Sequence, residues 1–582
     1  MLPALVVFAA ALYVGMAGTP ALVDDDVDAA HALVAREMLE RHDWAILYQD
    51  GIRYLIRPPL HFWLIGGSYA LFGQTAFSTR LPVALAMVGL VALIFVFGRR
   101  FFGARAGFYA ALVVATSPGM FLFTRVVIPE AIYALEFTAI FYLFLRSWTG
   151  TLDPRLGYPG AAAVMGLAAL TRGPIGVLFP AGAIALFLLA TGGWRRWREL
   201  RLPSSAAVFL AVAVPWHVIA ALRAPGFLWA YFVNEHVLRA LGRREPRDYS
   251  AVPAGLWLLE QLVWLFPWSL FLPSLVRIFP PARSWRVSGN AGAQARLLLF
   301  CWTACIFGFF LLESGSRMEY YAFGAWPALA LLLGAGLDAA ERRGERWVRA
   351  IAAGLAVFAL FYAAAAGAFA AAGRRGAGDV AADLRSGAAE SYLSAMARLR
   401  DLTPQALSDL RTPLLLSAVF LAVAFVTAWA LRRRGRLVAA GAATACGMAG
   451  LFLAANLAYA DLEPMFSSRE LARQLSPLLR PSDRVALYGD IRVAPGIAFY
   501  CRRRVLLYNA RMTNLAFGSR YPDAPKTLYD DADFATLWSG AERVILVVPA
   551  DRNDEALAHL PPGSYRVLAS AGGKTAYVNR AG

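Results

Sequence analysis

The sequence between residues 24 and 59 reads DDDVDAAHALVAREMLERHDWAILYQDGIRYLIRPP, and it separates two apolar segments of the chain. It opens with four carboxylates in five residues, from Asp24 to Asp28, and it closes with Arg57 followed by two prolines. Charged groups at the edge of a bilayer are costly to place and usually serve a function there. The stretch therefore predicts a membrane protein whose polar loop carries chemistry.

The composition also indicates a polytopic membrane protein. Of the 582 residues 59% are apolar and 16% are charged, with a mean hydropathy of +0.52, whereas soluble domains are about 45–50% apolar. The net charge of +17 is nearly all arginine, because Lys526 and Lys574 are the two lysines. The arginines cluster in short loops between apolar segments, which favours a topological role over a nucleic-acid partner.

Apolar segments of about 20 residues predict thirteen membrane-spanning helices. We place them at residues 3–23, 81–98, 106–123, 131–146, 158–172, 174–191, 205–222, 255–276, 296–312, 321–338, 347–372, 413–431 and 437–459. The even-numbered gaps are rich in arginine and are therefore predicted to be cytoplasmic. The outer loops are then 24–80, 124–130, 172–174, 223–254, 313–320 and 373–412. We expect a multi-pass protein of the cytoplasmic (inner) membrane, with its active site and its C-terminus outside.

The predicted fold is mainly α, with a soluble α/β domain at the C-terminal end. Residues 1–460 form the transmembrane domain, and its first outer loop, residues 24–80 (loop one), contains two helical segments. Residues 28–41 have helical apolar spacing, and residues 60–72 are apolar but too short to span, so both are predicted to lie at the membrane interface. Residues 461–582 alternate strand-like and helical runs over the length of one ordinary domain, outside the membrane.

The acids of loop one are candidates for a general base. One aspartate of the cluster is predicted to accept a proton from an acceptor hydroxyl, and Arg57 is predicted to bind a phosphate through its forked donors. The alternative for the aspartates is a solvated acidic flank of the first span. Asp28 is assigned to substrate binding.

Further outer-loop residues extend this candidate site. Glu130 is a possible second catalytic carboxylate or a helix cap. Arg172 and Arg317 are possible ligands of the donor phosphate, or cations that snorkel to the interface. We assign five residues of two outer loops to substrate binding: Glu235, His236, Arg239, Tyr320 and Tyr321. The first three of them are equally typical of an aromatic belt with one ion pair.

Acids on one loop and arginines on several, all on the outer side, suit catalysis on a lipid-linked phosphate, because the leaving phosphate needs positive charge. The four cysteines have no other metal ligands near them in sequence. We therefore expect neither a metal nor a cofactor.

The motifs of residues 24–330 resemble those of the protein mannosyltransferase and aminoarabinose transferase family, which are C-type, polyprenyl-phosphate-sugar-dependent glycosyltransferases. The matching stretches are DDDVD at 24–28, AREML at 35–39, GIRYLIRPPL at 51–60, RLP at 80–82, LTRGP at 170–174, FVNEH at 232–236, PWS at 267–269 and SRMEYY at 316–321.

The resemblance implies a donor cavity under loop one. The family's first-loop acid maps to Asp25 or Asp26, with Asp24 and Asp28 not excluded. Its phosphate-binding lysine maps to Arg57, the lysine of its Lys-Gly-Pro turn to Arg172, and its second-loop aspartate to Glu130. The sequence departs from the family pattern in two ways. Arginine replaces lysine at both cationic positions, and Ile56 stands directly before Arg57, where the family often has a glutamate.

The expected function is transfer of a sugar from a polyprenyl-phosphate donor to an extracytoplasmic acceptor, a lipid A-like glycolipid or another glycan, by an inverting displacement. Three alternatives stay open at this point: a protein O-glycosyltransferase of the same family, a transporter or flippase for lipid-linked sugars, and a non-catalytic scaffold. The expected partners are the donor, a glycolipid or protein acceptor, and membrane lipids.

Overall fold

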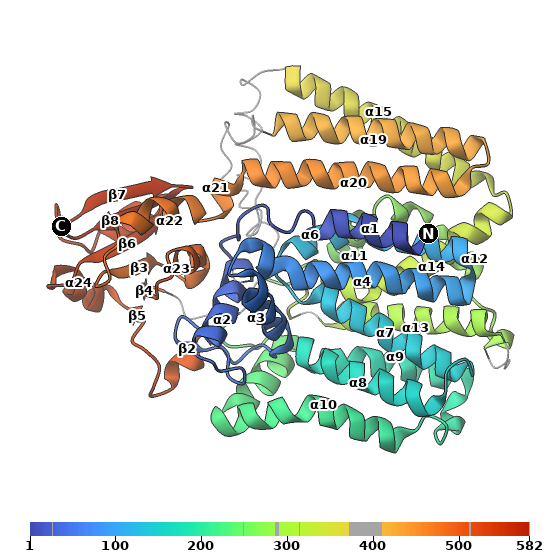
Figure 1. The fold of residues 1–582 in the computed structure, drawn as a ribbon, viewed down its shortest axis with the longest axis horizontal. Coiled ribbons are helices and arrows are strands. Elements are labelled where there is room, and N and C mark those ends of the chain that lie inside the picture. Colours follow the sequence, from blue (N-terminus) through green and yellow to red (C-terminus); the bar gives the residue numbers. More distant parts are fainter. Residues whose placement is uncertain are drawn as a thin grey trace.

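The computed structural model describes residues 1–25, 27–247, 250–285, 290–313, 315–371, 410–510 and 514–580. Asp26 and most of the predicted outer loop 373–412 lie outside these residues. The described chain has two parts: a bundle of long helices and a smaller α/β part at the C-terminal end (Figure 1). Loop one lies between them, at one end of the bundle.

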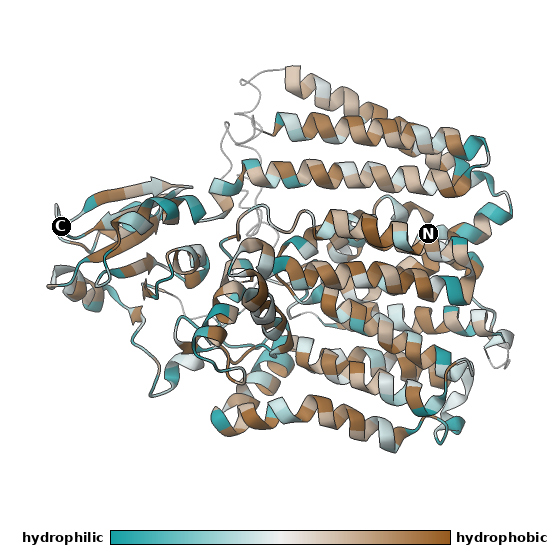
Figure 2. Cartoon of the chain, in the orientation of Figure 1, coloured by the Kyte–Doolittle hydropathy of each residue, from teal (hydrophilic) through white to brown (hydrophobic). Residues whose placement is uncertain are grey.

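The helices of the bundle follow the apolar segments of the sequence. They are α1 (Leu2–Tyr13), α4 (Ala76–Phe102), α5 (Ala104–Thr116), α6 (Pro118–Arg125), α7 (Glu130–Trp148), α8 (Pro154–Arg172), α9 (Ile175–Thr191), α10 (Leu202–Arg223), α11 (Ala254–Trp264), α12 (Pro273–Ile278), α13 (Ala291–Leu312), α14 (Trp326–Arg342), α15 (Arg346–Ala371), α19 (Arg411–Arg433) and α20 (Leu437–Asp461). Figure 2 shows that these helices are largely hydrophobic along their length, with hydrophilic residues at the loops.

The chain is therefore a multi-pass membrane protein with a mainly α fold, as predicted. Among the described residues seven helices are long and apolar enough to cross a membrane, or eight if α5 and α6, bent by 45°, form one span. The count of thirteen spans stays a prediction.

Three predicted spans differ clearly from the observed helices, and two of these differences occur at a proline. The first helix ends at Tyr13 instead of residue 23, ahead of Gly15, Gly18 and Pro20. The predicted span 106–123 breaks before Pro118, and the predicted span 255–276 breaks after Trp264, ahead of Pro267. Proline lacks the N–H that a helix interior requires, and glycine weakens a helix.

Loop one contains the two predicted helices, α2 (Asp28–Glu40) and α3 (Leu60–Phe72). Between them a short hairpin pairs β1 (Tyr48–Gln49) with β2 (Ile52–Arg53). Its turn, Asp50-Gly51, has positive φ at both residues, the conformation that Asp-Gly favours in two-residue hairpins. Helix α2 is buried from Asp28 to Met38, not on one face alone, because the C-terminal part covers its other side.

The C-terminal part is an α/β structure built on a six-stranded sheet of order β5-β4-β3-β6-β8-β7. Its strands are β3 (Arg484–Tyr488), β4 (Val505–Tyr508), β5 (Leu528–Tyr529), β6 (Val544–Pro549), β7 (Arg566–Ala571) and β8 (Lys574–Val578). The first four in this order are parallel, and β8 and β7 are antiparallel to their neighbours. The helices are α21 (Glu463–Phe466), α22 (Arg469–Leu475), α23 (Pro495–Tyr500), α24 (Asp531–Ser539) and α25 (Asn553–Leu557).

Loop one and the C-terminal sheet share one hydrophobic core. Leu33 and Met38 of α2 and Phe62 of α3 belong to the same buried cluster as Val485 of β3 and Ile545 of β6. Burial of apolar side chains contributes roughly 1.5–3 kcal/mol for each one that is fully enclosed. The two regions, far apart in sequence, therefore stabilise each other.

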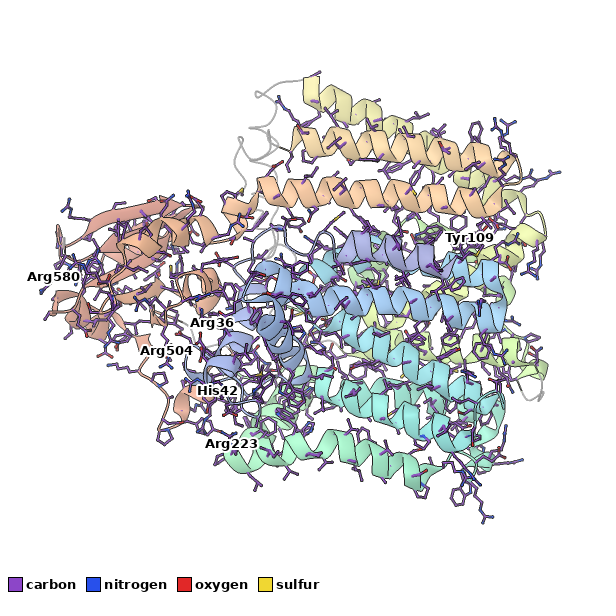
Figure 3. All side chains as sticks on the ribbon, viewed as in Figure 1. Arg36, His42, Tyr109, Arg223, Arg504 and Arg580 are labelled. Atoms are coloured by element: carbon purple, nitrogen blue, oxygen red, sulfur yellow. The ribbon has the colours of Figure 1, made fainter. Side chains whose placement is uncertain are left out.

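Polar contacts at the same junction complete this packing. Arg36 of α2 donates to the carbonyls of Ala498 and Phe499 at the end of α23, at 2.9 and 3.1 Å; Figure 3 labels Arg36 at this junction. The carboxylate of Asp50 accepts the N–H of Val505 at 3.0 Å. Burial raises the pKa of Asp50 to about 7, against the opposing effects of this N–H and of the nearby arginines.

We predict that Asp50 makes the protein less stable as the pH rises from about 5 to about 7. In this window folded Asp50 keeps its proton while the unfolded chain loses it, which lowers the free energy of unfolding by about 1.4 kcal/mol per pH unit. Thermal unfolding in detergent at several pH values should show this contribution as the difference in slope between the wild type and Asp50→Asn. The slope of Asp523→Asn, at an exposed side chain, should equal that of the wild type. An unchanged slope in Asp50→Asn would contradict the prediction.

Candidate active site

Glu235 lies at the centre of a cluster of three arginines. It belongs to η2 (Trp229–Leu238), a π-helical segment in the predicted outer loop 223–254 (loop four). Arg57 of loop one reaches Glu235 at 3.2 Å, Arg244 reaches it at 2.7 Å, and Arg239 also pairs with it. The side chain of Glu235 is 1% exposed. Loop one and loop four are thus joined by a buried carboxylate.

The arginines keep Glu235 ionised. Burial by itself would raise the pKa of this carboxyl, but Arg239, Arg244 and Arg57 together hold the pKa well below its ordinary value. Three cations around one anion leave an excess of positive charge in a poorly solvated place. Such a place attracts anions.

A second ion pair joins α7 and α8. Arg172, the last residue of α8, lies 2.9 Å from Glu130, the first residue of α7. Glu130 is completely buried, and the Arg172 guanidinium lies 5.9 Å from the ring centre of Tyr321. The two charged residues are far apart in sequence, so only the fold brings them together.

Gly173 connects the two ion-pair clusters. It has a φ of +73°, and a Cβ atom there would lie 2.6 Å from the Tyr231 hydroxyl and 2.8 Å from Nε2 of His236. Only glycine allows the turn after Arg172 to pack this closely on loop four. Nδ1 of His236 lies 2.6 Å from the carbonyl of Tyr231, and burial lowers the pKa of His236 to about 4. His236 is therefore a neutral imidazole beside the Arg172 turn.

Two buried histidines of loop one contact the same backbone carbonyl, and the sequence analysis identified neither of them. His31 of α2 and His61 of α3 donate ring N–H groups to the carbonyl of Val127, at 2.8 and 3.2 Å. Burial lowers the pKa of His61 to about 4, and it also lowers the pKa of His31 well below its usual range. Because Val127 precedes Glu130 by three residues, the histidines fix the segment that leads to it. No local motif marks this pairing.

The described aspartates between residues 24 and 28 are not a solvated acidic flank, since Asp24, Asp25 and Asp28 are buried. Asp25 accepts the N–H groups of Val27 and Asp28 at 3.0 and 2.5 Å and thereby caps α2. Asp28 forms a buried ion pair with Arg80 at 2.6 Å. Asp24 binds the C-terminal part, through Lys574 at 3.0 Å. Asp26 lies outside the described residues.

Arg317 has a structural explanation that the sequence did not reveal. Its guanidinium donates to the carbonyls of Phe310, Leu311, Glu313 and Val252, at 2.5 to 3.3 Å. Three of these carbonyls belong to the end of α13 or follow it, where a cation is favourable. The predicted contact of Arg317 with a phosphate stays a prediction. So do the substrate contacts assigned to Asp28, Glu235, His236, Arg239, Tyr320 and Tyr321.

Within the described residues, no group of three His, Cys, Asp or Glu side chains is arranged to hold a metal ion. The side chains gathered here are glutamates, arginines and histidines. Buried glutamate–arginine pairs that join separate loops form a positively charged centre that is suited to a phosphate.

We predict that Glu235→Gln destabilises the protein by about 3–5 kcal/mol, because it leaves three arginines without their buried anion. Thermal unfolding in detergent should show the loss, and inorganic phosphate should stabilise this variant more than the wild type. The matched control is Glu199→Gln, which removes an exposed partner of Arg196 and should change little. Equal stability of the two variants would be the contrary result.

The comparisons with known proteins agree with the motifs. The sequence model of the dolichyl-phosphate-mannose-protein mannosyltransferases matches residues 56–219. The undecaprenyl phosphate-alpha-4-amino-4-deoxy-L-arabinose arabinosyl transferase of Edwardsiella ictaluri is 27% identical, over 52% of this chain and 53% of its own length. The transferase of the same name from Pectobacterium carotovorum is 25% identical, over 91% of this chain and 90% of its own length. The chain thus spans about half the length of the first of these relatives.

The fold has a solved counterpart. The crystal structure of ArnT from Cupriavidus metallidurans bound to undecaprenyl phosphate matches with a TM-score of 0.83 at 23% identity, covering 100% of this chain and 98% of that chain. The apo structure of the same protein matches with a TM-score of 0.81 at 24% identity. These matches confirm the C-type fold, and together with the relatives they confirm the resemblance that the motifs indicated.

Proposed function

We propose that this chain, which resembles the protein mannosyltransferase and aminoarabinose transferase family in motifs and in fold, is a membrane glycosyltransferase. It transfers one sugar from a polyprenyl-phosphate carrier to a lipid A-like glycolipid or another glycan. The reaction takes place on the outer side of the cytoplasmic membrane, the side that the arginine-rich gaps assign to loop one and loop four.

One observation carries this proposal: Arg57 and Arg172 come from separate outer loops and each is held by a buried glutamate. With Arg239 and Arg244, four arginines face two glutamates, so two positive charges are in excess. Arg57 and Arg172 also lie near the same buried histidine, since the positive charge of each lowers the pKa of His61. A leaving lipid phosphate gains most from such preorganised positive charge.

The aspartates between residues 24 and 28 have different roles in this proposal. Asp24 and Asp28 are each paired with a buried cation, Lys574 and Arg80. We assign the role of base to Asp25 or Asp26, the two positions to which the first-loop acid of the resembling family maps. The acceptor oxygen bonds to the anomeric carbon as the bond from that carbon to the phosphate oxygen breaks. The hydroxyl proton passes to the aspartate, and the negative charge remains on polyprenyl phosphate beside Arg57 and Arg172.

Glu130 acts on this reaction through Arg172. Its completely buried carboxylate fixes the guanidinium at 2.9 Å, and the Val127 carbonyl held by His31 and His61 fixes the start of its helix. Because the guanidinium is already in place, it does not have to move when charge develops on the phosphate.

We predict that purified protein releases free polyprenyl phosphate from a radiolabelled donor only when membrane extract supplies an acceptor. Asp25→Asn with Asp26→Asn should abolish the release, because general-base catalysis contributes about 10²–10⁴-fold. Arg57→Met and Arg172→Met should also lose it, through weaker phosphate stabilisation. Recovery of the label in a glycolipid or a protein fraction distinguishes the two acceptor classes.

The control for these variants is Asp523→Asn, which removes the exposed partner of Arg53 and should keep full activity. Wild-type turnover in the double aspartate variant would refute the assignment of the base to Asp25 or Asp26. Donor binding without turnover, with extract present, would favour a carrier of lipid-linked sugars over a transferase.

A further inference from the structure

The carboxylate of Asp24, which directly precedes Asp25, contacts three residues of the C-terminal α/β part. Its Oδ2 lies 3.0 Å from Nζ of Lys574 and accepts the Ser468 hydroxyl at 2.5 Å, while its Oδ1 accepts the N–H of Gly496 at 2.8 Å. The N–H of Asp24 itself donates to the carbonyl of Phe466 at 2.7 Å. We call this group of contacts the Asp24 clamp.

The clamp is buried and tightly packed. The side chains of Asp24 and Lys574 are 0% and 2% exposed. A Cβ atom on Gly496 would lie 2.6 Å from Oδ1 of Asp24, so the carboxylate sits directly on the backbone of α23. Removing one partner from a buried ion pair is strongly destabilising. The position of Asp24 therefore depends on the C-terminal part being docked.

Neighbouring residues are held in the same way. The N–H of Ala21 donates to Glu463 and that of Leu22 donates to the Tyr500 hydroxyl, both at 2.8 Å. On the other side of the candidate base, Asp28 is tied to Arg80 of α4. Asp25 thus lies between two anchored neighbours, Asp24 on the C-terminal part and Asp28 on the bundle.

We propose that the C-terminal α/β part belongs to the transfer site and acts on it through the Asp24 clamp. Lys574, Ser468 and Gly496 hold Asp24, and Asp24 sets the position of the neighbouring base. Asp24 and Lys574 are positioning residues, since they touch neither the sugar nor the phosphate. This inference rests on the proposed glycosyltransferase function.

The first test measures docking without any activity. Lys526 and Lys574 are the two lysines of the chain, and Lys526 is exposed. A water-soluble amine-acylating reagent, applied to the full chain in detergent, should modify Lys526 quickly and leave Lys574 protected in peptide mass spectrometry. Asp24→Asn should increase the acylation of Lys574 and not that of Lys526. Equal rates at both lysines in the wild type would overturn the clamp.

The second test measures catalysis in variants that move Asp24. Gly496→Ala keeps every charge but forces the Asp24 carboxylate from its place, and the double variant Asp24→Asn with Lys574→Met removes both charges, so that no unpaired ion is buried. Each should lower kcat for release of polyprenyl phosphate by about a hundredfold, the size of effect that a small misplacement causes. The Kd for free polyprenyl phosphate, which the arginines set, should stay as in the wild type.

Lys526→Met, at the exposed pair with Asp533, is the matched control and should keep full activity. Wild-type kcat in both clamp variants, measured per folded molecule, would overturn the inference and leave the proposed function intact. Lower kcat accompanied by equally weakened lipid binding would overturn it too, because that pattern indicates general loss of structure. No transfer by the wild type with any donor would instead refute the proposed function itself.

Discussion

The ion pair of Arg80 and Asp28, fully enclosed between α4 and the start of α2, is the contact on which loop one depends. Arg80 also donates to the carbonyls of Ala17, Pro20 and Ala21, at 3.4, 2.6 and 3.1 Å. These carbonyls belong to the segment after α1 that has lost its helical hydrogen bonds. Because unpaired backbone groups in a membrane protein cost several kcal/mol, one buried guanidinium allows the chain to leave the helix here. The acidic segment can then turn inward instead of entering solvent.

The sequence predicted much of the framework and little of the charge pairing. Hydropathy located the long helices, and strand-like runs located the C-terminal sheet, because both signals are local. The pairs Arg57–Glu235 and Arg172–Glu130 could not be predicted, since nothing local links residues on different loops. The roles of Arg317 and Asp24 were hidden for the same reason. Pro118 and Pro267 accompany breaks in two predicted spans, but other prolines, such as Pro82 and Pro180, lie inside continuous helices. A proline by itself therefore could not have located the breaks.

The arrangement of charges also explains why arginine suits these positions. Arg57, Arg239 and Arg244 share one carboxylate, and each has further donors in its planar fork. A lysine would present a single compact charge in place of this fork. The cluster has more cations than its glutamate can neutralise, which costs folding energy in the absence of an anionic ligand. Such a cost is typical of a binding site that is formed before its ligand arrives.

The shared core of loop one and the C-terminal sheet has a consequence for biosynthesis. The helix α2 is among the first parts of the chain to be made, and the strands that cover it are among the last. Contacts between such distant segments form late, because the whole intervening chain must be in place first. Throughout translation and insertion, the apolar side chains of loop one therefore lack their cover. This shared core is complete only when the final hundred or so residues have been made and have packed against the first loop.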